Sequence, residues 1–379
     1  MHRVLVLGGG KIGRMIACLL APTGDYTVTV GDNDEAKLEL LRQRVPGAHP
    51  LRVDVTDRPA LARAIGDSDA VISALSYAWN PTVAELCAEA QKSYFDLTED
   101  RETTRRVREI ATRSRSDLVF MPQCGLAPGF VSVVANELTK SFDRLDKVFM
   151  RVGALPQFPS NFLKYNLTWS TDGLINEYCN PCEAIHEGVR RDMLPLEGLE
   201  HFSLDGVRYE AFNTSGGLGS LCETFDGRLR ELNYKTIRYL GHRDYMAFLL
   251  HELRMSEQRP LLKRILEEAI PVTFQDVVVV FCTVSGWRAG QLVQMSDARK
   301  IYNATVHGQN WSAIQITTAA GVCVMVDLYF SGALGATGVV RQEQVGLEAF
   351  LGNRFGQHYR SGTSSLFSLA TSDFSGELR

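Results

Sequence analysis

The chain has 379 residues, more than one hydrophobic core usually organises, so we expect two domains of ~150 to 200 residues each. Hydrophobic residues make up 45% of the chain and charged residues 22%, a composition typical of water-soluble globular proteins. The formal net charge of −4 argues against a dominant attraction to nucleic acid or anionic lipid, so we expect small-molecule partners, with no nucleic acid and no membrane.

Targeting and membrane segments are not expected. The first apolar strand begins near residue 3, which leaves no room for a signal peptide. The longest apolar stretch, 313–334, is interrupted by polar residues and favours an internal helix over a membrane span. The eight cysteines are scattered, and the C-x-x-C pair Cys179 and Cys182 has no second pair at a zinc-site interval. We therefore expect a cytoplasmic protein without a bound metal.

A glycine-rich turn near the N-terminus indicates a dinucleotide-binding site. A short apolar strand runs into Gly8, Gly10 and Gly13 with G-x-G-x-x-G spacing, and a helix-favouring stretch follows. Gly8 permits the tight turn, Gly10 lets the backbone approach a pyrophosphate, and Gly13 allows close helix packing, so that the helix N-terminus faces the phosphates. The cofactor-binding residues expected in this turn are Gly8, Gly10, Lys11, Ile12 and Gly13.

Asp32 is the acidic residue expected to bind the adenosine ribose. It lies 19 residues beyond Gly13 (32 − 13), at the end of the apolar strand 26–30 and near the ~20-residue spacing of such carboxylates. No Arg or Lys follows Asp32 directly, so nothing adjacent would neutralise a 2′-phosphate that the carboxylate itself would repel. The sequence therefore predicts NAD rather than NADP, with Asp34 as the alternative acid.

From residue 1 to about 123, short apolar strands alternate with amphipathic helices, a pattern that predicts an α/β fold with a doubly wound parallel Rossmann sheet. The strands are expected near 3–7, 26–30, 50–54, 69–74, 94–98 and 118–121. Ligands of such sheets bind at the carboxyl ends of the strands. This rule adds Asp54, Ser73 and Ala74 as cofactor-binding candidates, and Tyr77 and Asp96 as catalytic candidates.

The pattern changes after residue 129. A helix is expected near 129–140, followed by longer strand-like runs that include 147–152, 277–284 and 291–295. Because a hairpin-like turn separates the last two runs, we expect an α+β domain with a mixed or antiparallel sheet. The predicted organisation is a dinucleotide-binding domain at 1–125, rejoined by about 312–379, and a substrate domain at 126–311.

Several motifs beyond the dinucleotide turn resemble the saccharopine dehydrogenase superfamily. They are VISALSY at 71–77, Asp96-Leu97, GLAPG at 125–129, VGALP at 152–156, KYN at 164–166, Ser170, Gly173-Leu174, EAFNTSGG at 210–217 and YKTIRYLGH at 234–242. Within the superfamily the chain is most similar to bacterial L-lysine 6-dehydrogenases. Two departures bear on the substrate: Lys164 stands where an acidic residue is expected, and Thr98-Glu99-Asp100 replaces a Gly-Gly-His-like turn.

The resemblance implies an NAD-dependent enzyme, expected as a homodimer, that acts on a C–N bond of an amino acid. The implied reaction is oxidative deamination of lysine or a similar diamino acid, in which a deprotonated amine loses hydride and water hydrolyses the resulting imine. Imine reduction of the saccharopine or carboxynorspermidine type is the alternative within this class. A non-catalytic NAD-binding sensor or regulatory protein is the alternative from another class.

Five residues are the catalytic candidates. Arg238 offers a planar bidentate fork for a substrate carboxylate, or bridges structurally to a protein carboxylate. Lys235 is a second carboxylate partner or a base, and His242 is a proton relay near neutral pH, each weighed evenly against a structural role. Asp96 holds or deprotonates the substrate ammonium, or caps a helix. Tyr77 stacks on the cofactor or binds substrate, or only packs.

Overall fold

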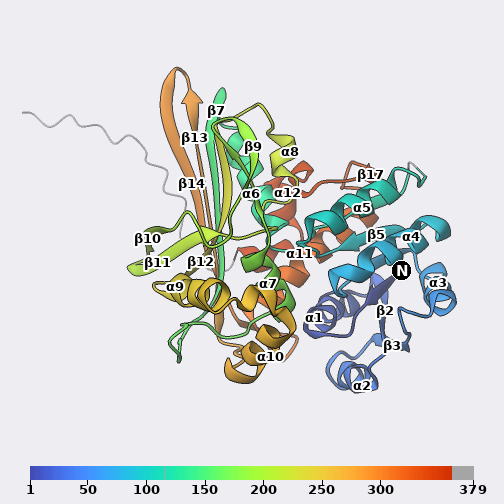
Figure 1. Ribbon diagram of the computed structural model, residues 1–379. Helices are drawn as coiled ribbons and strands as arrows, with labels where there is room; N and C mark the ends of the chain where they lie inside the picture. Colours follow the sequence, from blue (N-terminus) through green and yellow to red (C-terminus); the bar gives the residue numbers. More distant parts are fainter. Residues whose placement is uncertain (116, 361–379) are drawn as a thin grey trace, which may run out of the picture.

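The computed structural model describes residues 1–115 and 117–360, and its first sheet has seven parallel strands (Figure 1). The strands are β1 (His2–Leu7), β2 (Tyr26–Asp32), β3 (Ala48–Arg52), β4 (Ala70–Ser73), β5 (Ser93–Asp96), β6 (Val119–Met121) and β17 (Gly338–Val339). Their order is β17-β6-β5-β4-β1-β2-β3, which confirms the predicted Rossmann sheet. The inner strands are nearly continuous apolar runs because helices cover both faces.

The helices between these strands begin where the sequence supplies caps. They are α1 (Lys11–Leu20), α2 (Glu35–Arg44), α3 (Arg58–Gly66), α4 (Asn80–Ala90) and α5 (Arg101–Ala111). Asp34, Asp57 and Asp100 accept backbone amide hydrogen bonds at the starts of α2, α3 and α5. The strand predicted at 50–54 ends earlier, at Arg52, because the Asp54 carboxylate accepts hydrogen bonds from Thr56 and turns the chain.

The second domain is built on an eight-stranded mixed sheet. Its strands are β7 (Arg144–Pro156), β8 (Cys182–His186), β9 (Val189–Met193), β10 (Glu200–Leu204), β11 (Val207–Asn213), β12 (Glu231–Tyr239), β13 (Asp276–Arg288) and β14 (Gln291–Tyr302). The pairing β12 with β7 is parallel and the other pairings are antiparallel, as the predicted mixed sheet allows. The helices are α6 (Phe130–Thr139), α7 (Thr171–Cys179), α8 (Leu221–Thr224), α9 (His242–Ala247) and α10 (Arg259–Ala269).

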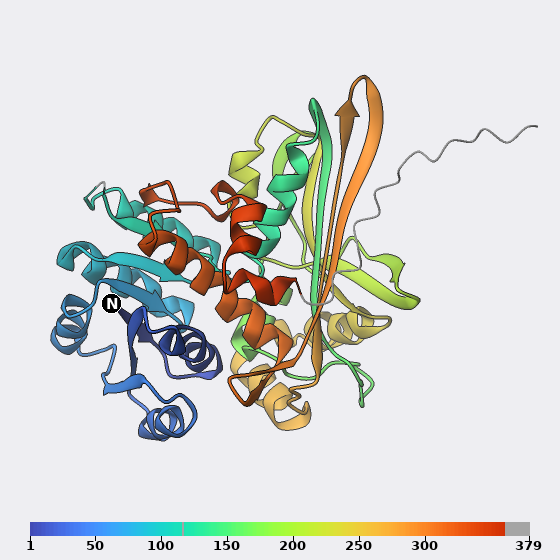
Figure 2. The ribbon, with the colours of Figure 1, turned by 180° about the vertical axis from the view of Figure 1, so that it is seen from behind.

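The last described part of the chain returns to the first sheet. A small hairpin, β15 (Ala304–Val306) and β16 (Gln309–Trp311), leads into α11 (Ala313–Phe330), then β17 and α12 (Leu347–Gly352). Figure 2 shows α11 in the middle of the molecule, between the two sheets. By length and composition alone α11 is long and apolar enough to cross a membrane, but 72% of it is buried within the protein. The predicted return over 361–379 lies outside the described residues.

The two sheets share one apolar core, with α11 at its centre. Buried side chains run from Val6 in β1 through Val324 in α11 to Val280 in β13. At Gly321 a Cβ atom would stand 2.7 Å from the carbonyl oxygens of Cys124 and Gly125, so the backbone of α11 packs directly on the turn between the domains. This packing places the ends of both sheets around one space.

Candidate active site

The glycine-rich turn has the geometry that a dinucleotide requires. Gly8 has φ +103°, and a Cβ there would stand 2.7 Å from the carbonyl oxygen of Ala74, while a Cβ at Gly13 would overlap the carbonyl of Gly8. At Gly10 the same position is open, with no atom within 4 Å. Since α1 begins there with no side-chain cap and no acidic residue in its first turn, its free amides fit a pyrophosphate.

Asp32 lies against this turn, and a lysine lies beside it. The carboxylate accepts a hydrogen bond from the Gly9 amide at 2.7 Å, while the Lys37 Nζ atom approaches its two oxygens at 3.4 and 3.5 Å. Because no Arg or Lys directly follows Asp32 in the sequence, we expected no cation beside its carboxylate. This expectation is wrong, because the first turn of α2 brings Lys37 next to Asp32. The alternative acid, Asp34, instead caps α2.

The other cofactor candidates divide between the site and the scaffold. Lys11, Ile12 and Ala74 line a cavity next to the turn. Ser73 does not line it, because its buried hydroxyl donates to the Asn80 side chain at 2.7 Å. Asp54 does not line the cavity and its carboxylate holds the turn after β3, so its contact with the cofactor stays a prediction.

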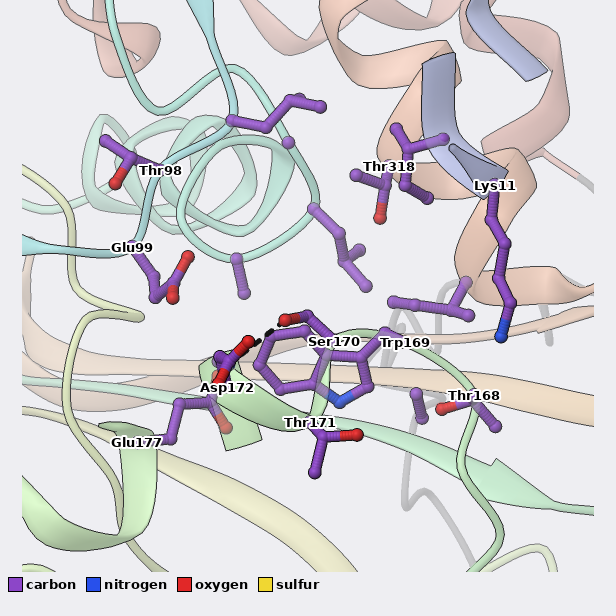
Figure 3. A pocket seen from close by; sticks show the side chains of 18 of the residues that line it. Lys11, Thr98, Glu99, Thr168, Trp169, Ser170, Thr171, Asp172, Glu177 and Thr318 are labelled. Atoms are coloured by element: carbon purple, nitrogen blue, oxygen red, sulfur yellow. Dashed lines mark hydrogen bonds between the residues drawn. The ribbon is translucent and has the colours of Figure 1, made fainter. Parts of the chain in front are cut away.

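A cavity of about 620 Å³ lies between the two sheets and receives side chains from both domains (Figure 3). Lys11 enters from α1, Tyr77 follows β4, Glu99 follows β5, and Thr318 comes from α11. Glycine, alanine and proline from 125–128 form part of the wall. The polar and aromatic side chains that the second domain contributes are Thr168, Trp169, Ser170, Thr171, Asp172, Glu177, Tyr234, Thr236, Arg238 and Glu267.

Strand alternation decides which candidates on β12 reach the cavity. Arg238 lines it, as do the two residues that precede it on the same face, Tyr234 and Thr236. Lys235 faces the opposite side of the sheet, where its ammonium group donates to Glu200 at 2.8 Å and to the carbonyl of Gly198. The prediction that Lys235 acts in the site is therefore corrected, because its side chain points away from the cavity.

Arg238 is oriented by a chain of hydrogen bonds. Its Nε atom donates to the Tyr178 hydroxyl at 2.8 Å, which bonds to His242 Nε2 at 3.0 Å, while His242 Nδ1 bonds to the carbonyl of Leu163 at 2.8 Å. Burial, followed by the charge of Arg238, lowers the pKa of His242 to about 3. The lowered pKa favours neutral His242 near pH 7, and its ring orients Tyr178 without lining the cavity, so the proton relay stays a prediction.

Asp96 is also a scaffold residue. Its fully buried carboxylate accepts hydrogen bonds from the amides of Thr98 and Gln123 and from the Tyr94 hydroxyl. These bonds fix the end of β5 and the start of the turn after β6. Asp96 does not line the cavity, whereas Tyr77 does.

Two carboxyl groups, the partly buried Glu99 and the buried Glu177, are the functional candidates that the sequence did not single out. Both line the cavity, Glu99 from the first domain and Glu177 from α7 (Figure 3). Burial raises the pKa of Glu99 to about 7 and that of Glu177 to about 8. The only sequence signal was the replacement of a Gly-Gly-His-like turn at Glu99; Glu177 lies in a helix without a motif.

Together these groups can bind and deprotonate a zwitterion. The raised pKa values of Glu99 and Glu177 favour their protonated forms near neutral pH, which reduces the negative charge that these two groups place in the cavity with Arg238. A substrate carboxylate can pair with Arg238 while its ammonium group faces Glu99 and Glu177. In the described ranges, 1–115 and 117–360, no group of three or more His, Cys, Asp or Glu side chains is placed to hold a metal.

The fold and the site define a two-domain dehydrogenase with a nicotinamide-dinucleotide turn and a substrate cavity between its domains. The family model described as saccharopine dehydrogenase NADP binding domain matches residues 4–118, and the saccharopine dehydrogenase C-terminal domain matches 125–353. The chain belongs to the saccharopine dehydrogenase family, which confirms the family resemblance seen in its motifs.

Individual relatives match over part of the chain. Saccharopine dehydrogenase [NADP(+), L-glutamate-forming] of Saccharomyces cerevisiae is 27% identical over 45% of this chain and 39% of its own length. The protein of the same name from Pyricularia oryzae is 24% identical over 71% of this chain and 60% of its own length. The chain thus spans less than two thirds of these relatives. None of them tests the narrower similarity to L-lysine 6-dehydrogenases, which stays a prediction.

The fold agrees along nearly the whole chain with one solved structure. The apo saccharopine dehydrogenase (L-Glu forming) of Saccharomyces cerevisiae superimposes with a TM-score of 0.75 at 17% identity. The match covers 92% of this chain and 95% of that chain.

Replacing Gly10 by Val should abolish cofactor binding while the fold is kept. The new side chain enters open space, so nothing in the protein is displaced, but it occupies the volume that a pyrophosphate needs. NADH fluorescence measures the binding and circular dichroism the fold. Unchanged NADH affinity in the folded variant would contradict the assignment of this turn.

Replacing Tyr178 by Phe should weaken substrate binding by roughly 5- to 30-fold, about 1 to 2 kcal/mol, because Arg238 loses the partner of its Nε atom. KM for the substrate should increase by this factor, and the affinity for NADH should be unchanged. Tyr239→Phe is the matched control, since its hydroxyl donates to the carbonyl of Pro156 outside the cavity. Equal kinetic effects of the two variants would show that the Tyr178 hydroxyl does not position Arg238.

Proposed function

We propose that the protein is an NAD-dependent dehydrogenase that oxidatively deaminates an amino acid, with lysine or a similar diamino acid as the substrate class. One observation carries this proposal: a buried arginine and two carboxyl groups with raised pKa values share a cavity with the dinucleotide turn. Membership of the saccharopine dehydrogenase family supports the same reaction class.

The residues of the cavity take distinct parts in this reaction. Arg238 binds the substrate α-carboxylate through its planar fork, and the Glu99 and Glu177 pair accepts the ammonium proton. The apolar wall of the turn 125–128 excludes water from the reacting carbon. The bound nicotinamide supplies the hydride acceptor.

Imine reduction is the second candidate, and the protonation of Glu177 favours it. With a pKa of about 8, this carboxyl is mostly protonated at pH 7 and can donate to a developing amine. The names of the yeast and Pyricularia relatives describe a saccharopine dehydrogenase that forms L-glutamate with NADP(+), which supports a saccharopine-type substrate but names the oxidative direction. The same cavity serves both directions, and assays started from amine or from imine separate them.

For the cofactor we propose NAD, on the position of Asp32 against the turn. A 2′-phosphate there would meet the carboxylate, which repels it. Lys37 acts in the opposite sense, because its ammonium group lies within reach of the same place. The preference for NAD is therefore set by the balance of these two charges.

Replacing Asp32 by Ala should erode the preference for NAD by about tenfold, the size of one charge-assisted hydrogen bond. In this variant Lys37 keeps only its 3.9 Å contact with Asp34 and can pair with a 2′-phosphate. The double variant Asp32→Ala with Lys37→Ala should lose that gain in NADP affinity. Calorimetry measures both cofactors, and tighter binding of NADP than NAD by the wild type would overturn the assignment.

Replacing Arg238 by Ala should leave NAD affinity intact and lower kcat/KM by roughly 30- to 1,000-fold, equivalent to ~2 to 4 kcal/mol. Arg238→Lys should restore only part, because a point charge cannot reproduce the bidentate fork. Lys235→Met, on the opposite face of the same strand, is the control and should keep full activity.

The diamine cadaverine, which lacks a carboxylate, tests the orientation of the substrate. It should be a poor substrate of the wild type and lose little more in Arg238→Ala. Equal losses for lysine and cadaverine would mean that Arg238 acts only on the structure of the domain. No turnover of any amine or imine by a wild type that binds NADH would favour a cofactor-binding sensor instead.

A further inference from the structure

A second cavity of about 730 Å³, here called the outer cavity, lies between the two domains on the side of α5. Its wall is largely charged, with Arg108 and Glu109 from α5 facing Glu183 and Arg190 from the strands β8 and β9. Glu109 is exposed, so the cavity reaches solvent. The proposed function assigns no part to this space.

Glu99 is the one residue, among those that the structure describes, that lines both cavities. Its position is fixed on two sides. The next residue, Asp100, caps α5, and Gly216 packs so closely that a Cβ would stand 2.7 Å from the carbonyl oxygen of Glu99. Since Gly216 also lines the outer cavity, Glu99 and this glycine form part of the wall where the two cavities meet.

The outer cavity is suited to water. Gln123 lines it with a side chain that is 2% exposed, and its Oε1 atom has no hydrogen-bond partner in the described part of the chain. A buried acceptor of this kind is normally satisfied by an ordered water. The ionic groups of the wall offer further hydrogen-bond partners for water. A chain of hydrogen-bonded water molecules can therefore connect Glu99 with the solvent.

Amine oxidation, on which this inference rests, releases a proton in the substrate cavity. The amine RCH₂–NH₃⁺ becomes the iminium RCH=NH₂⁺ by losing one proton from nitrogen and one hydride from carbon, and the hydride reduces the nicotinamide. The proton must leave while substrate and cofactor fill the cavity. We propose that Glu99 accepts this proton from the substrate cavity and passes it to water in the outer cavity.

The charges around Glu99 suit repeated proton transfer. Burial is the main cause that places its pKa at about 7, and the negative charges of Asp100 and Asp96 raise it further. Glu177 faces it from α7, and the neighbouring loop 214–217 carries no ionisable side chain. Glu99 thus takes and releases a proton near neutral pH, and its carboxylate fraction increases as the pH rises through 7.

Glu99→Gln tests the transfer, because the amide keeps the shape and cannot carry the proton. In the wild type, kcat/KM for amine oxidation should rise with pH through about 7. The variant should lose roughly 100-fold in kcat and lack this rise, and added formate should restore part of the rate. Glu102→Gln, an exposed carboxylate of the outer cavity, is the matched control and should behave as the wild type.

Infrared spectroscopy tests the same group without turnover. The carbonyl band of protonated Glu99, identified by its loss in Glu99→Gln, should disappear as bulk pH rises through about 7, both in the free protein and with NADH bound. If the band does not change with bulk pH in the NADH complex, the exit route is wrong. Full activity of Glu99→Gln would also overturn it. If the band titrates but the protein oxidises no amine, the proposed function is wrong, whereas the proton route from Glu99 to water is still supported.

Discussion

The direct contact between the α11 backbone and the carbonyl groups of Cys124 and Gly125 fixes the separation of the two sheets across the substrate cavity. Any side chain at Gly321 would separate the helix from the turn, and α11 also carries Ile314 and Thr318 into the substrate cavity. The turn leads out of the first domain, so a shift there would move the second sheet with it. The approach of Arg238 to the dinucleotide turn therefore depends on the absence of one methyl group.

The surroundings of Arg238 explain how a buried cation stays available to a ligand. Its Nε and Nη1 donors bond to the Tyr178 hydroxyl and to the carbonyl of Ile237, both of which are neutral. Neutral partners satisfy hydrogen bonds and fix the orientation of the guanidinium, while they leave its charge in place. Lys235, three residues away and on the opposite face of the strand, is instead paired with Glu200. The strand thus separates a charge meant for a ligand from one that stabilises the sheet.

The first domain could be predicted from sequence because its signals are local: the glycine spacing, the alternation of strands and helices, and the apolar strands that end in polar residues. The site was less accessible. A strand has a period of two, so Lys235 and Arg238 had to face opposite sides, but this follows only once β12 is known to be a strand there. The neutral state of His242 and the raised pKa of Glu177 result from burial by distant segments. Lys37 meets Asp32 only because α2 folds back.

Strand β17 shows that the first domain is not finished until the end of the described chain has been made. It pairs with β6 across more than 200 residues of intervening chain, and α11 covers α1. During synthesis the second domain is therefore translated before β17 and α11 are available. Until then, one edge of the first sheet and one face of α1 stay uncovered. Folding one domain before the other therefore stabilises such a chain little. Unfolding of either domain exposes apolar surface of the other.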